Sequence, residues 1–222
     1  MTRCASEDRI PIKGVAWTCP DPVPVRIETP RLVVRAYEPS DARALHETVD
    51  GCRGSLLPWL PWSEKDHADE ERSLHFILNQ RVHLREPSKL EWVVFGVFER
   101  DTGTLVGGHG IHGVRRETAS AETGYWLTPG ARGKGYATEA SAHVLSWAFR
   151  PQNRDGMGLN RVRIYCSHRN TASVDVPNRL GLREEVRQRE DFYVEGLGLT
   201  DRLGWGVLAA EWDADTHRPR AT

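Results

Sequence analysis

Apolar residues cluster in three short runs in the middle of the chain, a pattern that is typical of β-strands. Residues 90–99, 104–114 and 121–128 are rich in β-branched and aromatic residues, and turn-forming residues bound each run. The tripeptide Asp-Thr-Gly at 101–103 joins the first two runs as a hairpin turn would. The pattern therefore predicts three consecutive antiparallel strands.

Other segments have apolar residues every three or four positions, which indicates amphipathic helices. In the first of these, Ser40 is a candidate N-cap, and Gly51 and Gly54 are expected to end the helix. Pro87 is expected to stop the second helix, because the residue before a proline avoids helical geometry. We expect the helices at residues 38–49, 66–85, 136–149 and 170–181.

The remaining apolar runs complete the predicted sheet. A first strand is expected at 26–37, interrupted at Pro30 because proline has no N–H for a strand ladder. Further strands are expected at 161–167, 182–196 and 202–212. The order β-α-α-β-β-β-α-β-α-β-β predicts an α+β fold (mixed α/β) with one mixed sheet of seven strands and helices on both faces.

The two ends of the chain differ from this patterned region. Residues 1–24 hold four prolines and are expected to form an irregular arm, and residues 214–222 are expected to fray. Residues 25–213 show no internal repeat and no low-complexity stretch. We therefore expect a single domain over residues 25–213.

Composition and charge exclude several classes of protein. Lys and Arg number 30 against 31 Asp and Glu, so the net charge of −1 gives no basic field for nucleic acid or an anionic membrane. An apolar fraction of 39% with 8 tryptophans argues for a folded globule, and no apolar run could span a bilayer. The four cysteines lack metal-site spacing, and residues 1–17 lack the apolar stretch of a secretory signal. We expect a cytoplasmic protein without a metal.

A glycine-rich loop between the strand at 121–128 and the next helix is the strongest chemical signal. Gly133 and Gly135 remove side chains where a ligand would approach the backbone closely, and Arg132 and Lys134 add positive charge. Free N–H groups at a helix start, together with the helix dipole, suit a phosphate or pyrophosphate. The alternative is a flexible connection with solvated cations.

Two common nucleotide-binding motifs do not fit this loop. The P-loop needs serine or threonine after its Gly-Lys pair, but Gly135 follows the pair Gly133-Lys134, and Tyr136 rather than lysine follows Gly135. The dinucleotide fingerprint needs G-x-G-x-x-G, whereas the glycines here are spaced G-x-x-G-x-G. Neither of these two motifs therefore accounts for the loop.

The loop does fit R-x-x-G-x-A, from Arg132 to Ala137, preceded by "ETGYWL". In this the chain resembles the GCN5-related N-acetyltransferases (GNAT), and more narrowly their RimJ/RimL-like branch. The resemblance spans about residues 26–213 and is specific because separate segments agree in order. These other segments are "ETPRLVVRAYEPSDARAL", "LLPWLPW", "NTASVDVPNRLGL" and "LAAEW".

The resemblance implies a GNAT-type sheet, mixed but mostly antiparallel, whose fourth and fifth strands (121–128 and 161–167) splay apart to hold acetyl-CoA. It implies that backbone groups of Trp126, Leu127 and Thr128 pair with the pantetheine. It implies that amides of Arg132, Gly133, Lys134, Gly135, Tyr136, Ala137 and Thr138 hold the pyrophosphate. Asn170 would bond the pantetheine arm or, alternatively, only cap the following helix.

The resemblance also implies the chemistry, which is attack of an amine on a thioester. Many family members place a tyrosine seven residues after the helix-opening asparagine, but Pro177 stands there in this chain. The RimL-like alternative is Ser173, which would contact the cofactor and protonate the departing sulfur. An ordinary solvated helix serine is the other interpretation of Ser173.

The general base is open among three acids. The RimL-like pattern places a glutamate at the start of the loop between the last two strands, which points to Glu190 or Asp191. Glu122 is the other candidate, because related enzymes use a carboxylate there through water. Each of the three could instead be a surface or structural acid.

The acceptor pocket is expected near Trp59, Trp62 and His112, with His109 a further histidine on the same strand. The tryptophans could instead pin their loop to the core. The resemblance implies a peptide or small-molecule amine as acceptor, acetyl-CoA as cosubstrate, and a family habit of pairing as homodimers. A catalytically silent acyl-CoA-binding module, or a donor such as succinyl-CoA, are the alternatives.

Overall fold

The structure is a computed structural model that describes residues 17–219, and an eight-stranded sheet lies at its centre. The strands follow the order β1-β2-β3-β4-β5-β6-β8-β7 across the sheet. They are β1 (Arg26–Glu28), β2 (Leu32–Ala36), β3 (Val93–Glu99), β4 (Leu105–Arg115), β5 (Ser120–Leu127), β6 (Arg161–Ser167), β7 (Arg183–Val194) and β8 (Gly198–Leu208). Every neighbouring pair is antiparallel except β5 and β6, which are parallel.

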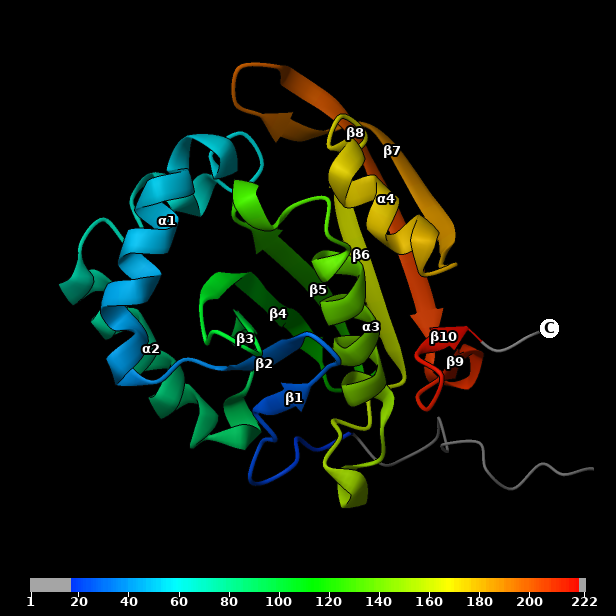
Figure 1. Ribbon diagram of the computed structural model, residues 1–222. Helices are drawn as coiled ribbons and strands as arrows, with labels where there is room; N and C mark the ends of the chain where they lie inside the picture. The colour runs from blue at the N-terminus through cyan, green and yellow to red at the C-terminus, as the bar shows by residue number, and fades with distance from the viewer. Residues whose placement is uncertain (1–16, 220–222) are drawn as a thin grey trace, which may run out of the picture.

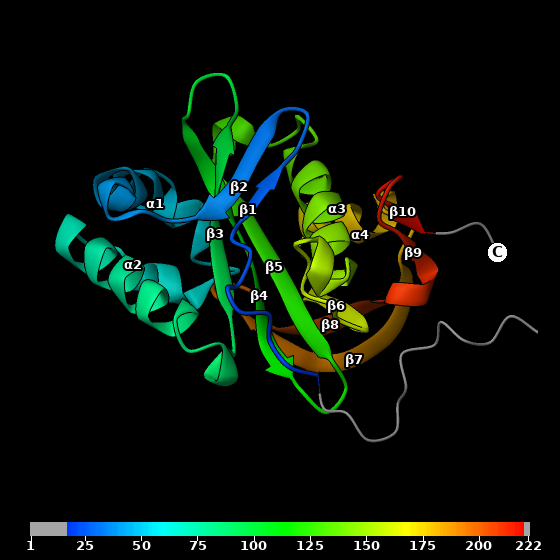
Figure 2. The ribbon, with the colours of Figure 1, turned by 90° about the horizontal axis from the view of Figure 1, so that it is seen from below.

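Four helices cover the two faces of this sheet. They are α1 (Ala42–Leu56), α2 (Glu70–Leu84), α3 (Tyr136–Phe149) and α4 (Thr171–Arg179). Helices α1 and α2 lie on one face and α3 and α4 on the other, as the two perpendicular views show (Figures 1 and 2). The mixed, mostly antiparallel α+β fold with helices on both faces is therefore confirmed.

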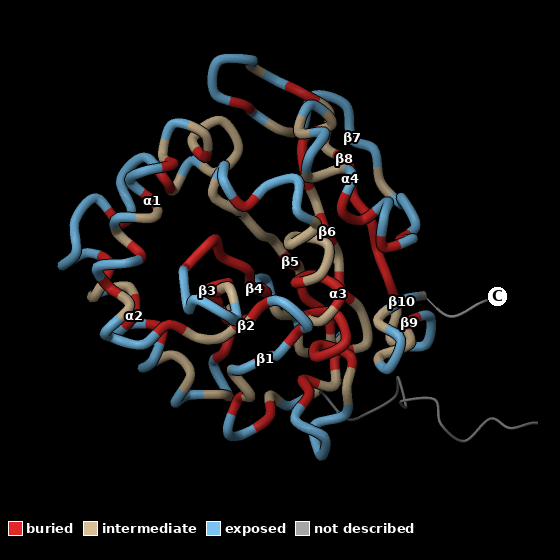
Figure 3. The backbone as a smooth tube through the Cα atoms, in the orientation of Figure 1, coloured by how far each residue is buried: buried red, intermediate tan, exposed pale blue. Residues whose placement is uncertain are grey.

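The core has one part under each layer of helices. Helix α3 is more deeply buried than α1, α2 or α4, and Figure 3 shows most of it as buried. Its Trp147 meets Phe95 of β3 edge to face at 5.3 Å. Its buried serines are satisfied, since Ser141 pairs with His109 and Ser146 with Trp212. On the other face Leu45 and Ile77 join α1 and α2 to the sheet.

The sheet has eight strands rather than the predicted seven. The segment 26–37 forms a tight hairpin of β1 and β2, with Ile27 opposite Val34. Pro30 lies in the turn, so the proline that was expected to interrupt one strand separates two. The threonine hydroxyl of Thr29 and the Leu32 carbonyl, 3.1 Å apart, close this turn.

The first helix does not end at its glycines, and that prediction was wrong. Helix α1 runs through Gly51 and Gly54 to Leu56, because Cys52 and Leu56 continue its buried face. Burial of this face outweighs the roughly 1 kcal/mol that each glycine costs a helix. The helix expected at 66–85 spans Glu70–Leu84, with Asp69 as its N-cap.

The C-terminal segment, which was expected to fray from residue 214, is paired in its described part. Strand β10 (Arg218–Pro219) pairs with β9 (Trp212–Asp213). The ring of His217 lies 2.7 Å from the Ser146 hydroxyl and so ties this small sheet to α3. Most of the expected N-terminal arm (residues 1–16) and the last three residues of the tail (220–222) lie outside the described residues.

No helix within residues 17–219 has the length and apolar character that a membrane crossing requires. The cysteines described there, Cys19, Cys52 and Cys166, are free thiols. Burial raises the pKa of Cys166 to about 12, so this thiol stays protonated. Cys4 lies outside the described residues.

Candidate active site

A gap opens where β5 and β6 stop pairing. The parallel ladder begins at Ser120 opposite Arg161 and ends at Thr123 opposite Ile164, although β5 continues to Leu127. Strand β6 continues to Ser167 but pairs only with β8 over that stretch. The predicted splaying of the fourth and fifth strands of the family sheet is thus present.

A cavity of 520 Å³ fills this gap. Its walls come from the ends of β5 and β6, the starts of α3 and α4, and the end of α1. Among the described residues, three arginines line it, Arg132, Arg169 and Arg202, against one acidic residue, Glu122. The lining therefore favours an anionic ligand although the whole chain is nearly neutral.

The glycine-rich loop leads from β5 into α3 and adopts left-handed backbone at two glycines. Gly133 has φ +75° and Gly135, the N-cap of α3, has φ +81°, conformations that favour glycine. A Cβ at Gly133 would meet no atom within 4 Å, so the loop is open on that side. The N–H groups of the first turn of α3 have no acceptor within the helix. The loop and helix start thus form a surface suited to an anion.

The two loop cations lie differently. Arg132 donates from Nε to the Leu127 carbonyl at 3.2 Å and from Nη2 to the Ser55 hydroxyl at 3.0 Å. These bonds tie the loop to the end of β5 and to α1. Lys134 is exposed, with Nζ 5.7 Å from the Tyr136 ring centroid. Lys134 is therefore the more available of the two side chains.

Only some of the predicted cofactor residues line the cavity itself. Those that do are Trp126, Leu127, Arg132, Ala137, Asn170 and Ser173. Thr128, Gly133, Lys134, Gly135, Tyr136 and Thr138 lie on the adjoining loop and first helical turn. Tyr136 donates its hydroxyl to Glu99 at 3.1 Å, away from the loop backbone.

Helix α4 presents Asn170 and Ser173 to the cavity. The Asn170 side chain accepts from the Ser173 N–H at 3.2 Å, so Asn170 is the N-cap of α4. Pro177 lies inside the helix and, lacking an N–H, cannot bond to the carbonyl of Ser173 four residues earlier. The Tyr125 hydroxyl donates to that carbonyl at 3.0 Å instead. Sequence reasoning missed Tyr125, although Pro177 signalled the free carbonyl.

An acid and a histidine meet on the floor of the cavity. Glu122 of β5 and His112 of β4 are register partners, and their Oε2 and Nδ1 atoms are 4.0 Å apart. Both line the cavity. A proton leaving a substrate could pass to this pair directly or through one water.

Glu190 and Asp191 lie elsewhere. They are inside β7, at a bulge between Gln188 and Phe192, because the strand continues to Val194 before it turns. The expectation that they begin the loop before the last strand was therefore wrong. Asp191 pairs with Arg202 at 3.2 Å, and neither acid is among the described residues that line the cavity.

The predicted acceptor residues divide between two cavities. Trp59 lines the first cavity. Trp62 lines a second cavity of 350 Å³, and His112 lines both. His109 points to α3, where its Nε2 lies 3.0 Å from the Ser141 hydroxyl. Burial lowers the pKa of His109 to about 3, which fits a neutral structural histidine.

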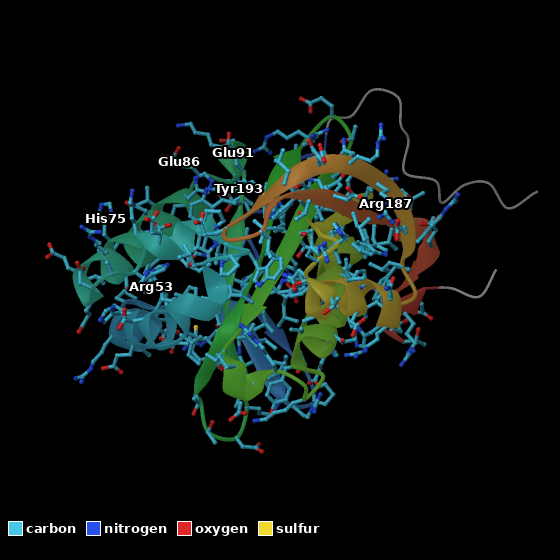
Figure 4. All side chains as sticks on the ribbon, turned by 90° about the horizontal axis from the view of Figure 1, so that it is seen from above. Arg53, His75, Glu86, Glu91, Arg187 and Tyr193 are labelled. Carbon is cyan, nitrogen blue, oxygen red and sulfur yellow. The ribbon has the colours of Figure 1, made fainter. Side chains whose placement is uncertain are left out.

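The hairpin of β7 and β8 extends beside the mouth of the cavity. Figure 4 shows Tyr193 near the end of this hairpin that reaches toward α1 and α2, with Arg187 farther along it. Phe192 and Arg202 of the hairpin line the cavity. Among residues 17–219, no cluster of three or more metal-binding side chains is placed to hold a metal ion.

Comparisons with known proteins agree with this geometry. The family profile described as "Acetyltransferase (GNAT) domain" matches residues 31–183. YdaF of Bacillus subtilis (strain 168), which carries the provisional name ribosomal N-acetyltransferase, is 29% identical over 184 residues, covering 83% of this chain and 94% of YdaF.

Solved structures show the same fold. Mycobacterium smegmatis RimJ in complex with CoA-disulfide has a TM-score of 0.73 at 24% identity, covering 87% of this chain and 93% of RimJ. The ribosomal-protein-S5-alanine acetyltransferase of Vibrio fischeri has a TM-score of 0.72 at 24% identity, covering 85% and 99%.

The sheet, the gap and the matching profile define an acyl-CoA-dependent acyltransferase. The chain belongs to the GNAT acetyltransferase family, and its relatives and structural neighbours are of the RimJ/RimL-like kind.

Proposed function

We propose that the protein is an N-acetyltransferase that moves the acetyl group of acetyl-CoA to a primary amine by direct attack within a ternary complex. The observation that carries this proposal is the cavity between the diverging ends of β5 and β6. The start of α3 borders it through Ala137, and the start of α4 borders it through Ser173. A thioester carrier with an anionic end and an extended arm fits that arrangement.

The cofactor would lie along the gap with its diphosphate at the glycine loop. Backbone amides from Arg132 to Thr138 would hold the diphosphate, aided by the dipole of α3. Residues Trp126–Thr128 would pair with the amides of pantetheine, as an added strand pairs with a free sheet edge. Asn170 caps α4 and would contact the pantetheine from there.

The reaction forms a C–N bond and breaks the C–S bond of the thioester. We assign the proton leaving the amine to Glu122, with His112 beside it, because these two line the cavity. Glu190 and Asp191 are set aside as bases because they do not line it. The Ser173 hydroxyl would give its proton to the departing thiolate and regain one from solvent.

The names of the relatives favour a protein acceptor. YdaF and the Vibrio fischeri enzyme are both named for ribosomal substrates, which supports the α-amine of a polypeptide as acceptor. A small-molecule amine and a longer acyl donor such as succinyl-CoA are the competing versions. A homodimeric state and a cytoplasmic location stay predictions.

Release of free thiol from acetyl-CoA in the presence of amines and N-terminal peptides tests the proposal, with mass spectrometry to identify the acetylated product. The expected result is thiol release that depends on the amine, with a product in which one acetyl group replaces one hydrogen of the amine. Tight coenzyme A binding without turnover on any amine would indicate a silent binding module.

A further inference from the structure

The second cavity adjoins the first on the face of the sheet covered by α1 and α2. The two cavities share lining residues, Leu60, His112, Gly124, Tyr125 and Trp126. At 350 Å³ the second lies within the range of ligand pockets, roughly 300–1,000 Å³. A molecule held at the junction can therefore extend into either space.

Glycines form the floor of the second cavity. Gly110 of β4 is paired with Gly124 of β5, and Gly108 lies two residues before it on β4. A Cβ at Gly110 would approach the Val93 carbonyl to 2.7 Å, and one at Gly108 would collide with the Trp126 indole. At Gly124 a Cβ would meet only His112 Nε2, at 3.7 Å. Trp126 therefore covers Gly108, and the open part of the floor is the space above Gly124.

Aromatic rings form the walls. Trp62 meets Trp126 edge to face with ring centroids 6.2 Å apart, and it meets His67 at 5.9 Å. Phe76 lies 4.9 Å from His67 and 6.4 Å from Tyr37. All five rings line the cavity. Such a set of ring edges and faces suits a flat apolar group.

The interior of the cavity offers no charge to a ligand. Asp66 is the one acidic side chain among the described lining residues, and it is exposed. Burial lowers the pKa of His67 to about 4, and its Nδ1 lies 3.1 Å from the Ser73 hydroxyl. Because His67 stays neutral, a charged group placed here would lose hydration without gaining a partner.

The pair of Glu122 and His112 lies at the junction of the two cavities instead. Glu122 lines the first cavity and faces His112, which lines both. An amine next to this pair would have its acyl donor on one side and the aromatic cavity on the other. The group next to the amine therefore decides which acceptors fit.

We infer that the second cavity takes a flat, uncharged aromatic group of the acceptor, so that the preferred substrates are primary amines bearing such a group, as in a peptide beginning with phenylalanine or tryptophan. This inference rests on the proposed function. It goes further because it assigns Trp62, Phe76 and the glycine floor to acceptor selection.

Amino-acid amides, which lack the free carboxylate, test the inference with the full-length enzyme and acetyl-CoA. Phenylalaninamide and tryptophanamide are compared with alaninamide, serinamide, lysinamide and glutamate α-amide by kcat/KM for thiol release. We expect the aromatic amides to exceed alaninamide by about 10-fold or more, the range that one well-filled apolar pocket supplies. Lysinamide and glutamate α-amide should rank lowest.

A matched pair of variants tests the location of the pocket. Gly124→Val should fill the space above the floor and lower the ratio of kcat/KM for phenylalaninamide over alaninamide to about one. Gly51→Val, on the exposed side of α1 with no atom within 4 Å of its Cβ, should leave that ratio unchanged. Trp62→Leu, in the wall, is a second variant should Gly124→Val fail to fold.

The outcomes separate this inference from the proposed function. Acetylation of alaninamide or lysinamide as efficiently as phenylalaninamide overturns the inference and leaves the proposed function standing. An aromatic preference that survives both Gly124→Val and Trp62→Leu in folded enzyme also overturns it. If no amide is acetylated and acetyl-CoA does not bind, both the inference and the proposed function are overturned.

Discussion

The Tyr125 hydroxyl donates to the backbone carbonyl of Ser173 at 3.0 Å, and this bond joins β5 to α4 beside the cavity. The carbonyl is available because Pro177 has no N–H to donate to it. Burial raises the pKa of the Tyr125 phenol, so the hydroxyl keeps its proton and remains a donor. The tyrosine thus replaces a helix hydrogen bond and fixes the turn that carries Ser173.

Tyr125→Phe should therefore loosen α4. Loss of the bond leaves the Ser173 carbonyl without its partner, and the free energy of unfolding should fall by about 1–2 kcal/mol in a urea titration. The kcat should fall as well, because the Ser173 hydroxyl loses its fixed position. Tyr193→Phe, at an exposed tyrosine, is the matched control and should change neither quantity.

The double variant Tyr125→Phe/Pro177→Ala checks the reason for this effect. Alanine restores an N–H that can donate to the Ser173 carbonyl, so the two substitutions should couple by about 0.5–1 kcal/mol. Strictly additive losses of stability would show that Tyr125 acts on α4 in some other way.

A second long-range contact holds the glycine loop. Arg31 donates from Nε to Glu139 in the first turn of α3 at 2.6 Å and from Nη1 to the Lys134 carbonyl at 2.9 Å. Burial alone would raise the pKa of Glu139, but hydrogen bonds from Thr29 and Arg31 outweigh it and hold that pKa below its usual value. Arg31 therefore neutralises a carboxylate beside the proposed diphosphate site.

Arg31→Ala should weaken coenzyme A binding by about 10-fold in a calorimetric titration, since Glu139 would then repel the diphosphate. Glu139→Gln in the same chain should recover most of that affinity. The KM for acetylpantetheine, which has no diphosphate, should be unaffected by Arg31→Ala. Arg43→Ala, which removes an exposed pair with Glu47 on α1, is the control. An equal loss with both donors would make Arg31 a purely structural residue.

Ser173→Ala should lower kcat by about 10- to 100-fold while the dissociation constant of coenzyme A changes less than about 2-fold, because the hydroxyl is assigned to the departing thiolate. Steady-state thiol release at saturating substrates measures kcat, and calorimetry measures the dissociation constant. The exposed Ser88→Ala is the control. Turnover equal to wild type would remove Ser173 from the mechanism.

Stability should fall in acid because of two buried histidines. The pKa values of His67 and His109, about 4 and about 3, lie below that of an unfolded histidine, about 6.5. Their contribution to the free energy of unfolding is complete above pH 6.5. It is lost as the pH falls toward 4, because the histidines bind protons in the unfolded chain but not in the folded chain. Each histidine should lower the free energy of unfolding by up to about 1.4 kcal/mol per pH unit.

Urea titrations at pH 7.5 and pH 5 measure this dependence. The difference in the free energy of unfolding between pH 7.5 and pH 5 should be smaller in His67→Asn or His109→Asn than in the wild type. It should not change in His75→Asn, whose side chain is exposed on α2 (Figure 4). An undiminished difference in the buried-site variants would place the acid sensitivity elsewhere.

Local signals accounted for the elements that position the site. Helix α3 was predicted at 136–149 and is found at Tyr136–Phe149, and β6 was predicted and found at 161–167. For both elements, the spacing of apolar residues and the glycine or polar residues at the ends are local features of the sequence, so they could be recognised without knowledge of tertiary contacts. The order of these elements also made the gap between β5 and β6 foreseeable through the family resemblance.

The errors arose where tertiary contacts determine the end of an element or the position of a side chain. Helix α1 continues past Gly51 because Cys52 and Leu56 are buried by other segments. Strand β7 is mostly exposed and contains bulges, so its charged sequence shows little alternation of apolar and polar residues. The end of the strand was misjudged for that reason, and Glu190 was placed in the following loop. Tyr125 and Ser173 are 48 residues apart, and no local pattern pairs them.

A crystal structure of the full chain with coenzyme A would show where the cofactor binds. We expect diphosphate oxygens about 3 Å from backbone nitrogens between Gly133 and Thr138, with the pantetheine between the separated ends of β5 and β6. Coenzyme A bound away from the start of α3, or β5 and β6 paired to their ends with no space between them, would refute this binding mode.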